Sequence, residues 1–180
     1  MPPARDALWI FGYGSLLFRP DFPFEERVPA RIRGFTRRLD QGSPDHRGTP
    51  ERLGRVATLV RDEGAWVGGA VHRVAARDEE RVLAQLDHRE QGGYERVTLA
   101  ALPVDGDDPR AAITATTWIA TPDNPFHLGP EPLEIMVAQI RGATGPSGPN
   151  VEYVLRLADA LRAMRVDDPH VEALARALAG

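Results

Sequence analysis

The stretch WIFGYGSLL, residues 9–17, begins as a short apolar strand and breaks into a turn with a glycine on each side of Tyr13. Glycine is used where the backbone must adopt φ > 0 or let another group come close. A strand that ends in such a turn exposes consecutive backbone N–H groups, which can hold an anion or a polarised carbonyl oxygen. We therefore hypothesise that this turn holds a substrate and that a distant carboxylate, Glu90, performs the chemistry.

Other interpretations of the turn compete with this one. A plain tight turn after a buried strand explains an isolated Gly-x-Gly about as well as a binding site does. A dinucleotide-binding fingerprint would need a third glycine at Leu17 and a helix pattern after it, and both are missing. A nucleophile elbow fails because Ser15 lacks a glycine two residues away on both sides.

Composition limits the class of protein. The 180 residues, 42% of them apolar, suit one globular domain that spans residues 1–180. The net charge of −4 gives no electrostatic reason to expect a nucleic-acid partner. Cysteine is absent, which excludes disulfides, thiolate metal sites and cysteine nucleophiles. Because residues 1–6 lack an apolar leader and no long apolar run follows, we expect a soluble cytoplasmic protein without membrane binding. The sequence carries no signal of oligomeric state.

Apolar patterns predict strands first and helices mostly late. The predicted strands are residues 8–11, 31–39, 55–60, 66–74, 94–104 and 112–120. The predicted helices are residues 77–88, 131–141 and 151–165, with a short peripheral helix that starts at 167–169. The predicted loops are residues 18–29, 41–50, 121–130 and 142–150, and 62–64 reads as a hairpin turn between two strands. This order favours an α+β fold on a mixed or antiparallel sheet, with closure into a small barrel as one option.

Glu90 is the candidate catalytic residue because it ends a predicted helix and precedes two glycines. A catalytic carboxylate is usually held on a rigid element beside a flexible turn. A solvated charge at a helix end is the alternative. No His-Glu-x-x-His or similar spacing exists, so we expect no metal and interpret His46, His72 and His127 as loop or surface residues.

Arginines and one tyrosine are further candidates. Arg37, Arg38 and Arg47 carry forked guanidinium groups that suit a carboxylate, although surface salt bridges are an alternative. Tyr153 lies one helical turn after Asn150, so its hydroxyl would reach a substrate. Packing in the core with the hydroxyl at the surface explains Tyr153 equally well.

Four blocks of sequence, taken together, resemble a known family. They are FGYGSL (11–16), QGSPDHRG (41–48), LDHREQGGY (86–94) and GPSGPNVEY (145–153), and DNPFHLGP (123–130) also fits. In this order the blocks resemble the ChaC family of glutathione-specific γ-glutamylcyclotransferases. The resemblance runs from about residue 9 to about residue 164, and four ordered blocks are far more specific than any one of them.

The resemblance implies both a fold and a reaction. The fold would be the γ-glutamylcyclotransferase-like α+β barrel with flanking helices. The reaction would be that of a lyase, which cleaves glutathione to 5-oxoproline and Cys-Gly without water or a cofactor, with Glu90 as acid and base. The implied substrate-binding turn consists of Gly12, Tyr13, Gly14, Ser15, Leu16 and Leu17. Arg38 and Tyr153 complete the substrate-binding residues that we expect.

The reaction needs no side-chain nucleophile, because the glutamyl α-amine attacks its own γ-carbonyl. This suits a chain without cysteine or a catalytic triad. Two alternatives remain open at this stage. One is a cyclotransferase for other γ-glutamyl amines or dipeptides, and the other is a non-catalytic module that binds a small amino-acid-like ligand.

Overall fold

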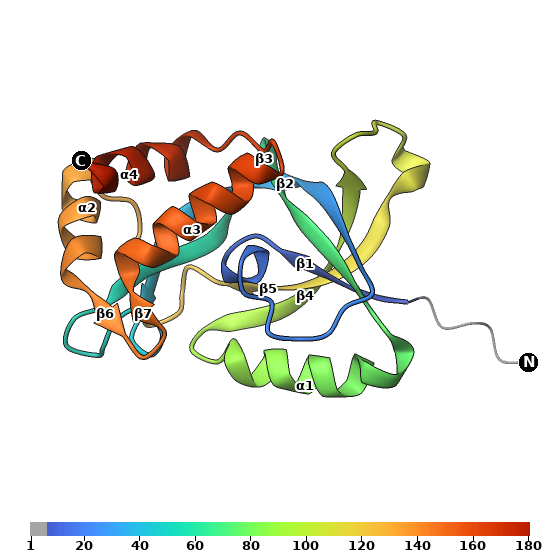
Figure 1. Cartoon of the computed structure of the whole chain (residues 1–180), viewed down its shortest axis with the longest axis horizontal. Helices are drawn as coiled ribbons and strands as arrows, with labels where there is room; N and C mark the ends of the chain where they lie inside the picture. The colour runs from blue at the N-terminus through green and yellow to red at the C-terminus, as the bar shows by residue number, and fades with distance from the viewer. Residues whose placement is uncertain (1–6) are drawn as a thin grey trace, which may run out of the picture.

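The computed structural model describes residues 7–180 as a five-stranded barrel with helices around it (Figure 1). The strands are β1 (Leu8–Gly12), β2 (Glu26–Ser43), β3 (Gly54–Val74), β4 (Tyr94–Pro103) and β5 (Ile113–Ala120). The barrel closes in the order β1-β3-β2-β4-β5. All the pairs are antiparallel except β1 with β5, which is parallel at Ile10 and Thr116. The expected α+β class and the closed barrel are confirmed.

The helices gather in two places. They are α1 (Glu79–Arg89), α2 (Leu133–Gly142), α3 (Asn150–Ala163) and α4 (Pro169–Ala179). Short 3-10 turns are η1 (Ser15–Leu17), η2 (Ala76–Asp78) and η3 (Pro109–Ala111), and β6 (Thr144–Gly145) pairs with β7 (Gly148–Pro149). Helices α2, α3 and α4 pack together on one side of the barrel, and α1 lies apart from them below β4 in the view of Figure 1. Within residues 7–180, none of the helices combines the length and apolar character that crossing a bilayer would require.

The predicted hairpin at 62–64 is wrong. Residues 55–60 and 66–74 belong to one strand, β3, and both parts pair with β2. Arg33 pairs with Trp66 and Phe35 with Arg61, so that residues 62–65 bulge opposite the single Gly34, whose φ is +89°. A bulge holds extra residues without ending a strand, which explains why turn-forming residues gave a misleading signal. Strand β2 also extends into both loops predicted beside it, 18–29 and 41–50.

Two apolar clusters hold the fold together. One fills the barrel and its contact with α2, α3 and α4, and includes Phe11, Leu59 and Leu157. The other packs α1 against the barrel. Val82 and Leu86 of α1 contribute to it together with Ile10, Leu16, Phe22, Val74 and Trp118. Leu16 is therefore fixed by α1, which links the glycine turn to the helix that ends before Glu90.

Helix α4 is part of the core, not peripheral as predicted. Its apolar residues recur at helical spacing, and Val171, Leu174, Ala175 and Leu178 are all buried. Asp168 caps the helix, because its Oδ1 accepts the N–H of Val171 at 3.0 Å. The other Asp168 oxygen lies 2.5 Å from Nη1 of Arg37, whose side chain is completely buried. Arg37 also donates to the carbonyl oxygens of Tyr13 and Gly68.

Replacing Arg37 by methionine removes all of these donors and leaves the Asp168 carboxylate without its buried partner. Breaking one side of such a buried pair costs roughly 3–5 kcal/mol, so Arg37→Met is expected to lower the free energy of unfolding in urea by about that amount. Arg33→Met, on an exposed part of the same strand, is the control and should change stability by less than ~0.5 kcal/mol. Equal effects of the two substitutions would contradict a structural role for the Arg37 pair.

Candidate active site

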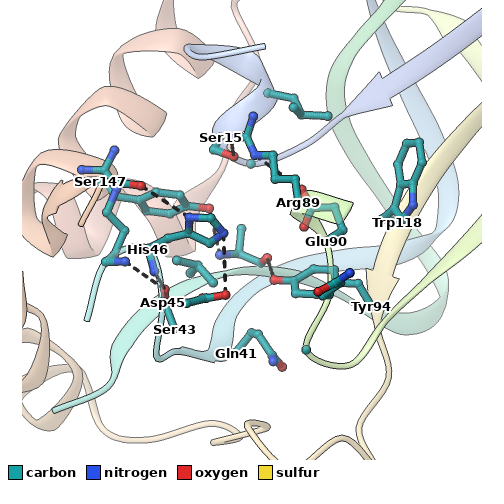
Figure 2. Close-up of a pocket in the computed structure, with 18 of the residues that line it drawn as sticks. Ser15, Gln41, Ser43, Asp45, His46, Arg89, Glu90, Tyr94, Trp118 and Ser147 are labelled. Atoms are coloured by element: carbon teal, nitrogen blue, oxygen red, sulfur yellow. Dashed lines mark hydrogen bonds and ion pairs between the residues drawn. The ribbon is translucent and has the colours of Figure 1, made fainter. Parts of the chain in front are cut away.

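A cavity of about 340 Å³ opens where the glycine turn meets the end of α1. Its wall draws on segments far apart in the sequence, and Figure 2 shows them converging. They include Phe11, residues 13–16, 41–47 and 89–92, Tyr94 and residues 117–118, with Ser147 and Tyr153 from the fourth block. The four blocks quoted above therefore meet at one place, with Phe126 of the further piece beside them.

The glycine turn lines this cavity through Tyr13, Gly14, Ser15 and Leu16. In η1 the Leu17 N–H donates to the Gly14 carbonyl at 3.0 Å and the Arg19 N–H donates to the Ser15 carbonyl at 2.7 Å. Among the hydrogen bonds of residues 7–180, none uses the N–H of Gly14, Ser15 or Leu16 as donor. These three amides are free to act as the cradle that we predict from the sequence, whereas the Leu17 N–H is already used inside the turn.

Glycine is required here for close approach. A Cβ on Gly14 would lie 2.9 Å from the Tyr153 hydroxyl, and a Cβ on Gly12 would lie 2.9 Å from Cβ of Leu16. Gly14 lines the cavity, but Gly12 and Leu17 do not. Their role in the structure is to let the turn close, with Leu17 buried in the core.

Glu90 follows the last residue of α1, and its N–H donates to the Leu86 carbonyl at 2.9 Å. Only 19% of its side chain is exposed, and the carboxyl faces the cavity (Figure 2). Burial raises the pKa of Glu90, Asp45 adds to the rise, and Arg89 and His46 oppose it. The turn after Glu90 depends on Gly92 and Gly93, whose φ angles are +97° and +102°.

Arg89 links Glu90 to the glycine turn. Its Nη2 donates to the Ser15 hydroxyl at 2.8 Å, and its Nη1 donates to the Arg19 carbonyl at 3.3 Å. Its Nε lies 3.9 Å from Oε1 of Glu90. Sequence reasoning did not single out Arg89, although it stands next to Glu90 in the third block.

Two tyrosines hold the edge of β3 that forms the floor of the cavity. The Ala57 N–H donates to the Tyr153 hydroxyl at 3.0 Å, and the Tyr94 hydroxyl lies 3.5 Å from the Ala57 carbonyl, to which it donates. Burial raises the pKa of Tyr153 to about 12 and that of Tyr94 well above its usual range. The Glu90 carboxylate also raises the pKa of both phenols and of Tyr13. All three phenols are therefore neutral at physiological pH, and they surround the carboxyl group.

Residues 43–47 form another wall of the cavity, and of these the sequence singled out only Arg47 as a candidate side chain. The Ser43 hydroxyl accepts the N–H groups of His46 at 3.3 Å and Arg47 at 2.9 Å, which fixes a tight turn. His46 places Nδ1 3.4 Å from Oγ of Ser147 and Nε2 3.9 Å from Oδ2 of Asp45. His46 was interpreted as a loop or surface histidine; it is half-exposed and lines the cavity. Its place in the second block was the available signal.

The arginines expected to hold a carboxylate behave differently. Arg37 is buried in the Asp168 pair, and Arg38 lies outside the cavity with its Nε 3.7 Å from Oδ2 of Asp40. Arg47 does line the cavity, but its Nη1 donates to the Pro149 carbonyl at 3.2 Å and lies 3.6 Å from Glu152. The structure thus brings Tyr13, Gly14, Ser15, Leu16, Glu90 and Tyr153 together and leaves Arg38 apart. Within residues 7–180, no three His, Asp or Glu side chains converge as metal ligands would.

Comparison with known proteins identifies the fold. The barrel and cavity define the γ-glutamylcyclotransferase fold, since a protein described as gamma-glutamyl cyclotransferase superposes with a TM-score of 0.58 at 18% identity, over 94% of this chain and 86% of its own. A selenomethionine-labelled yeast γ-glutamyl cyclotransferase specific to glutathione superposes with a TM-score of 0.87 at 28% identity, over 97% and 96% of the two chains.

The sequence comparison is more specific. The family model for ChaC-like protein matches residues 8–179. Glutathione-specific gamma-glutamylcyclotransferase 1 of Rattus norvegicus is 40% identical over 176 residues, which cover 96% of this chain and 78% of the relative. Glutathione-specific gamma-glutamylcyclotransferase of Saccharomyces cerevisiae is 30% identical over 220 residues, with 94% and 95% covered. This chain belongs to the ChaC-like protein family.

The bond from Ala57 to Tyr153 can be tested by removing one oxygen atom. Tyr153→Phe keeps the ring but leaves the buried Ala57 N–H without an acceptor, which costs roughly 1–3 kcal/mol. We expect that loss in urea unfolding. Tyr94→Phe is the matched control, because its 3.5 Å contact is long, and it should cost less than ~1 kcal/mol. The assignment would be wrong if Tyr94→Phe were the more damaging of the two.

Proposed function

We propose that this protein cleaves the γ-glutamyl bond of glutathione by intramolecular cyclisation, releasing 5-oxoproline and Cys-Gly, with Glu90 as general base and then general acid. One observation carries the proposal. A largely buried carboxyl and a turn with unpaired N–H groups line the same cavity, and both lie within residues 8–179, which the ChaC-like family model matches. The names of the relatives supply the substrate.

The first step is to fold the substrate. The glutamyl α-amine and its γ-carbonyl lie in one molecule, and well-oriented intramolecular reactions reach effective molarities of roughly 10⁵–10⁸ M. The amine attacks in its neutral form, and Glu90 accepts the proton that the attacking nitrogen loses as the new C–N bond forms. The new C–N bond closes the five-membered ring and places negative charge on the former γ-carbonyl oxygen.

The glycine turn is suited to that oxyanion. The N–H groups of Gly14, Ser15 and Leu16 have no other acceptor among the described residues, and one such donor is typically worth about 3–4 kcal/mol in the transition state. As the tetrahedral intermediate collapses, the bond to the cysteinyl nitrogen breaks. Glu90 returns its proton to that nitrogen, so Cys-Gly leaves as an amine and no water is consumed.

The environment of Glu90 suits both halves of this cycle. An ordinary glutamate has a pKa of about 4.3 and is a weak base at neutral pH. Because burial raises the pKa of Glu90, its carboxylate binds the amine proton more readily, and general acid–base help of this kind is typically worth ~10²–10⁴-fold. The neutral phenols of Tyr13, Tyr94 and Tyr153 surround the carboxyl with groups that do not compete for that proton.

The proposal is tested by incubating the purified protein with glutathione and measuring 5-oxoproline. Glu90→Gln keeps the size of the side chain but cannot accept a proton, so we expect turnover to fall by at least ~10²-fold. Binding of glutathione, followed by calorimetry, should persist. Glu80→Gln, on an exposed part of α1, is the control and should retain full activity. A Glu90→Gln protein with near-normal 5-oxoproline release would refute the role of Glu90.

A second candidate function is favoured by one feature of the site. The amide turn and Glu90 address only the γ-glutamyl half of a substrate, which all γ-glutamyl compounds share. The same assay with γ-glutamyl-alanine separates a glutathione-specific enzyme from a broader cyclotransferase. Release of 5-oxoproline from both compounds at similar kcat/KM would establish the broader activity.

A further inference from the structure

Arg89 joins two parts of the site that no β-ladder connects. The glycine turn follows β1, whereas Glu90 directly follows α1. Arg89, the last residue of α1, lies 74 residues after Ser15 in the sequence. In the described part of the chain, the hydrogen bonds between α1 and residues 15–21 come from side chains of α1. They are those of Arg89 to Ser15 and Arg19, and that of Gln85 to the Asp21 carbonyl at 2.7 Å.

We propose that Arg89 is a positioning residue, whose guanidinium locks the Ser15 turn onto the end of α1 so that the amide cradle and the Glu90 carboxyl keep one relative position. The proposal rests on the proposed function and deepens it by assigning a third component to the same site. Arg89 acts through Ser15 and Glu90 and does not itself exchange a proton with the substrate.

The geometry requires an arginine. Nη2 and Nη1 reach two different oxygens of the turn segment, the Ser15 hydroxyl and the Arg19 carbonyl, while Nε faces Glu90. A planar fork with several fixed donors can serve these directions at once, whereas a lysine ammonium at the end of a flexible chain cannot. Only 19% of the Arg89 side chain is exposed, so these donors are largely withdrawn from water.

The distance to Glu90 is also informative. At 3.9 Å the Arg89 Nε lies too far from Oε1 for a hydrogen bond. The positive charge therefore favours the ionised carboxylate without occupying the lone pairs that must accept the substrate's proton. A tight salt bridge would stabilise the same charge but block the base.

Several charged and titratable groups face Glu90, and Arg89 has the largest opposing effect among them. Burial raises the pKa of Glu90, Arg89 and His46 lower it, and Asp45 raises it further. The phenols of Tyr13, Tyr94 and Tyr153 complete the surroundings. Removing the Arg89 charge would let burial act with less opposition, so the pKa of Glu90 would rise. The basic form would then be populated only at higher pH.

Three variants separate positioning from a merely structural role, with 5-oxoproline release from glutathione as the assay. Arg89→Met removes the charge and both bonds to the turn segment. A misplacement of about 1 Å can cost ~10²-fold, so we expect kcat to fall roughly 10–100-fold with KM little changed. The acid limb of the kcat/KM profile should move to higher pH. Ser15→Ala removes one hydrogen bond but keeps the charge, so kcat should fall while the acid limb stays in place.

Arg89→Lys keeps the charge and loses the fork. It should leave the acid limb near that of the unmodified protein while kcat falls, and it carries the test if Arg89→Met does not fold. Three results would overturn the proposal. They are unchanged kcat in Arg89→Met and Arg89→Lys, a rise in KM alone, which would indicate direct contact with the substrate, or a loss of kcat in Arg89→Met with the acid limb unmoved.

A measurement without substrate distinguishes failure of this proposal from failure of the proposed function. Titration of the Glu90 carboxyl by carbon NMR, assigned with Glu90→Gln, should show a higher midpoint in Arg89→Met than in the unmodified protein. If the unmodified protein releases no 5-oxoproline, the proposed function fails, while the titration still tests the pairing of Arg89 with Glu90. An unchanged midpoint refutes that pairing whatever the substrate is.

Discussion

An unpaired strand edge dictates how this site is built. Strand β3 pairs with β2 along most of its length, but β1 covers its other edge only at residues 70–74. Over residues 55–57 the free edge would leave buried N–H and C=O groups unpaired, which is costly. Side chains of α3 provide hydrogen-bond partners for these backbone groups. Asn150 accepts the Arg55 N–H at 2.7 Å and donates to the Arg55 carbonyl at 2.8 Å, and Tyr153 accepts the Ala57 N–H.

The solution to this edge also shapes the cavity. Because Tyr153 must reach Ala57, its hydroxyl passes so close to the glycine turn that Gly14 has no room for a side chain. Tyr94 approaches the same residue from β4, and both tyrosines line the cavity that Glu90 faces. The walls of the cavity are thus built in part from the groups with which the barrel satisfies its own backbone. Each group stands on an element that packing holds still, as a preorganised site requires.

Sequence reasoning succeeded where the signal is local. Apolar alternation located most strands, and helical spacing located α1, α2 and α3. The glycine turn and Glu90, which were proposed from their immediate neighbours, both line the cavity. It failed where contacts with residues distant in the sequence determine the structure. Residues 62–64 have turn chemistry, but pairing with β2 on both sides makes them a bulge. Burial of α4 depends on its packing against α2, α3 and β2. The role of Arg89 depends on its hydrogen bond to Ser15, which no local pattern reveals. That the turn and Glu90 share a cavity was implied only by the resemblance of the ordered blocks.

The arginines show why residue type alone does not identify a substrate-binding group. Arg37, Arg47 and Arg55 are buried, and their guanidinium groups donate to carbonyl oxygens at irregular points of the fold. Arg37 donates to the carbonyl oxygens of Tyr13 and Gly68, and Arg55 donates to those of Leu39 and Gly129. A guanidinium suits these positions for the same reason that it suits a carboxylate, since its several donors are fixed in one plane. What distinguishes a site arginine is its surroundings. Arg89 lines the cavity, contacts a hydroxyl of the amide turn and stands beside Glu90, whose pKa burial raises.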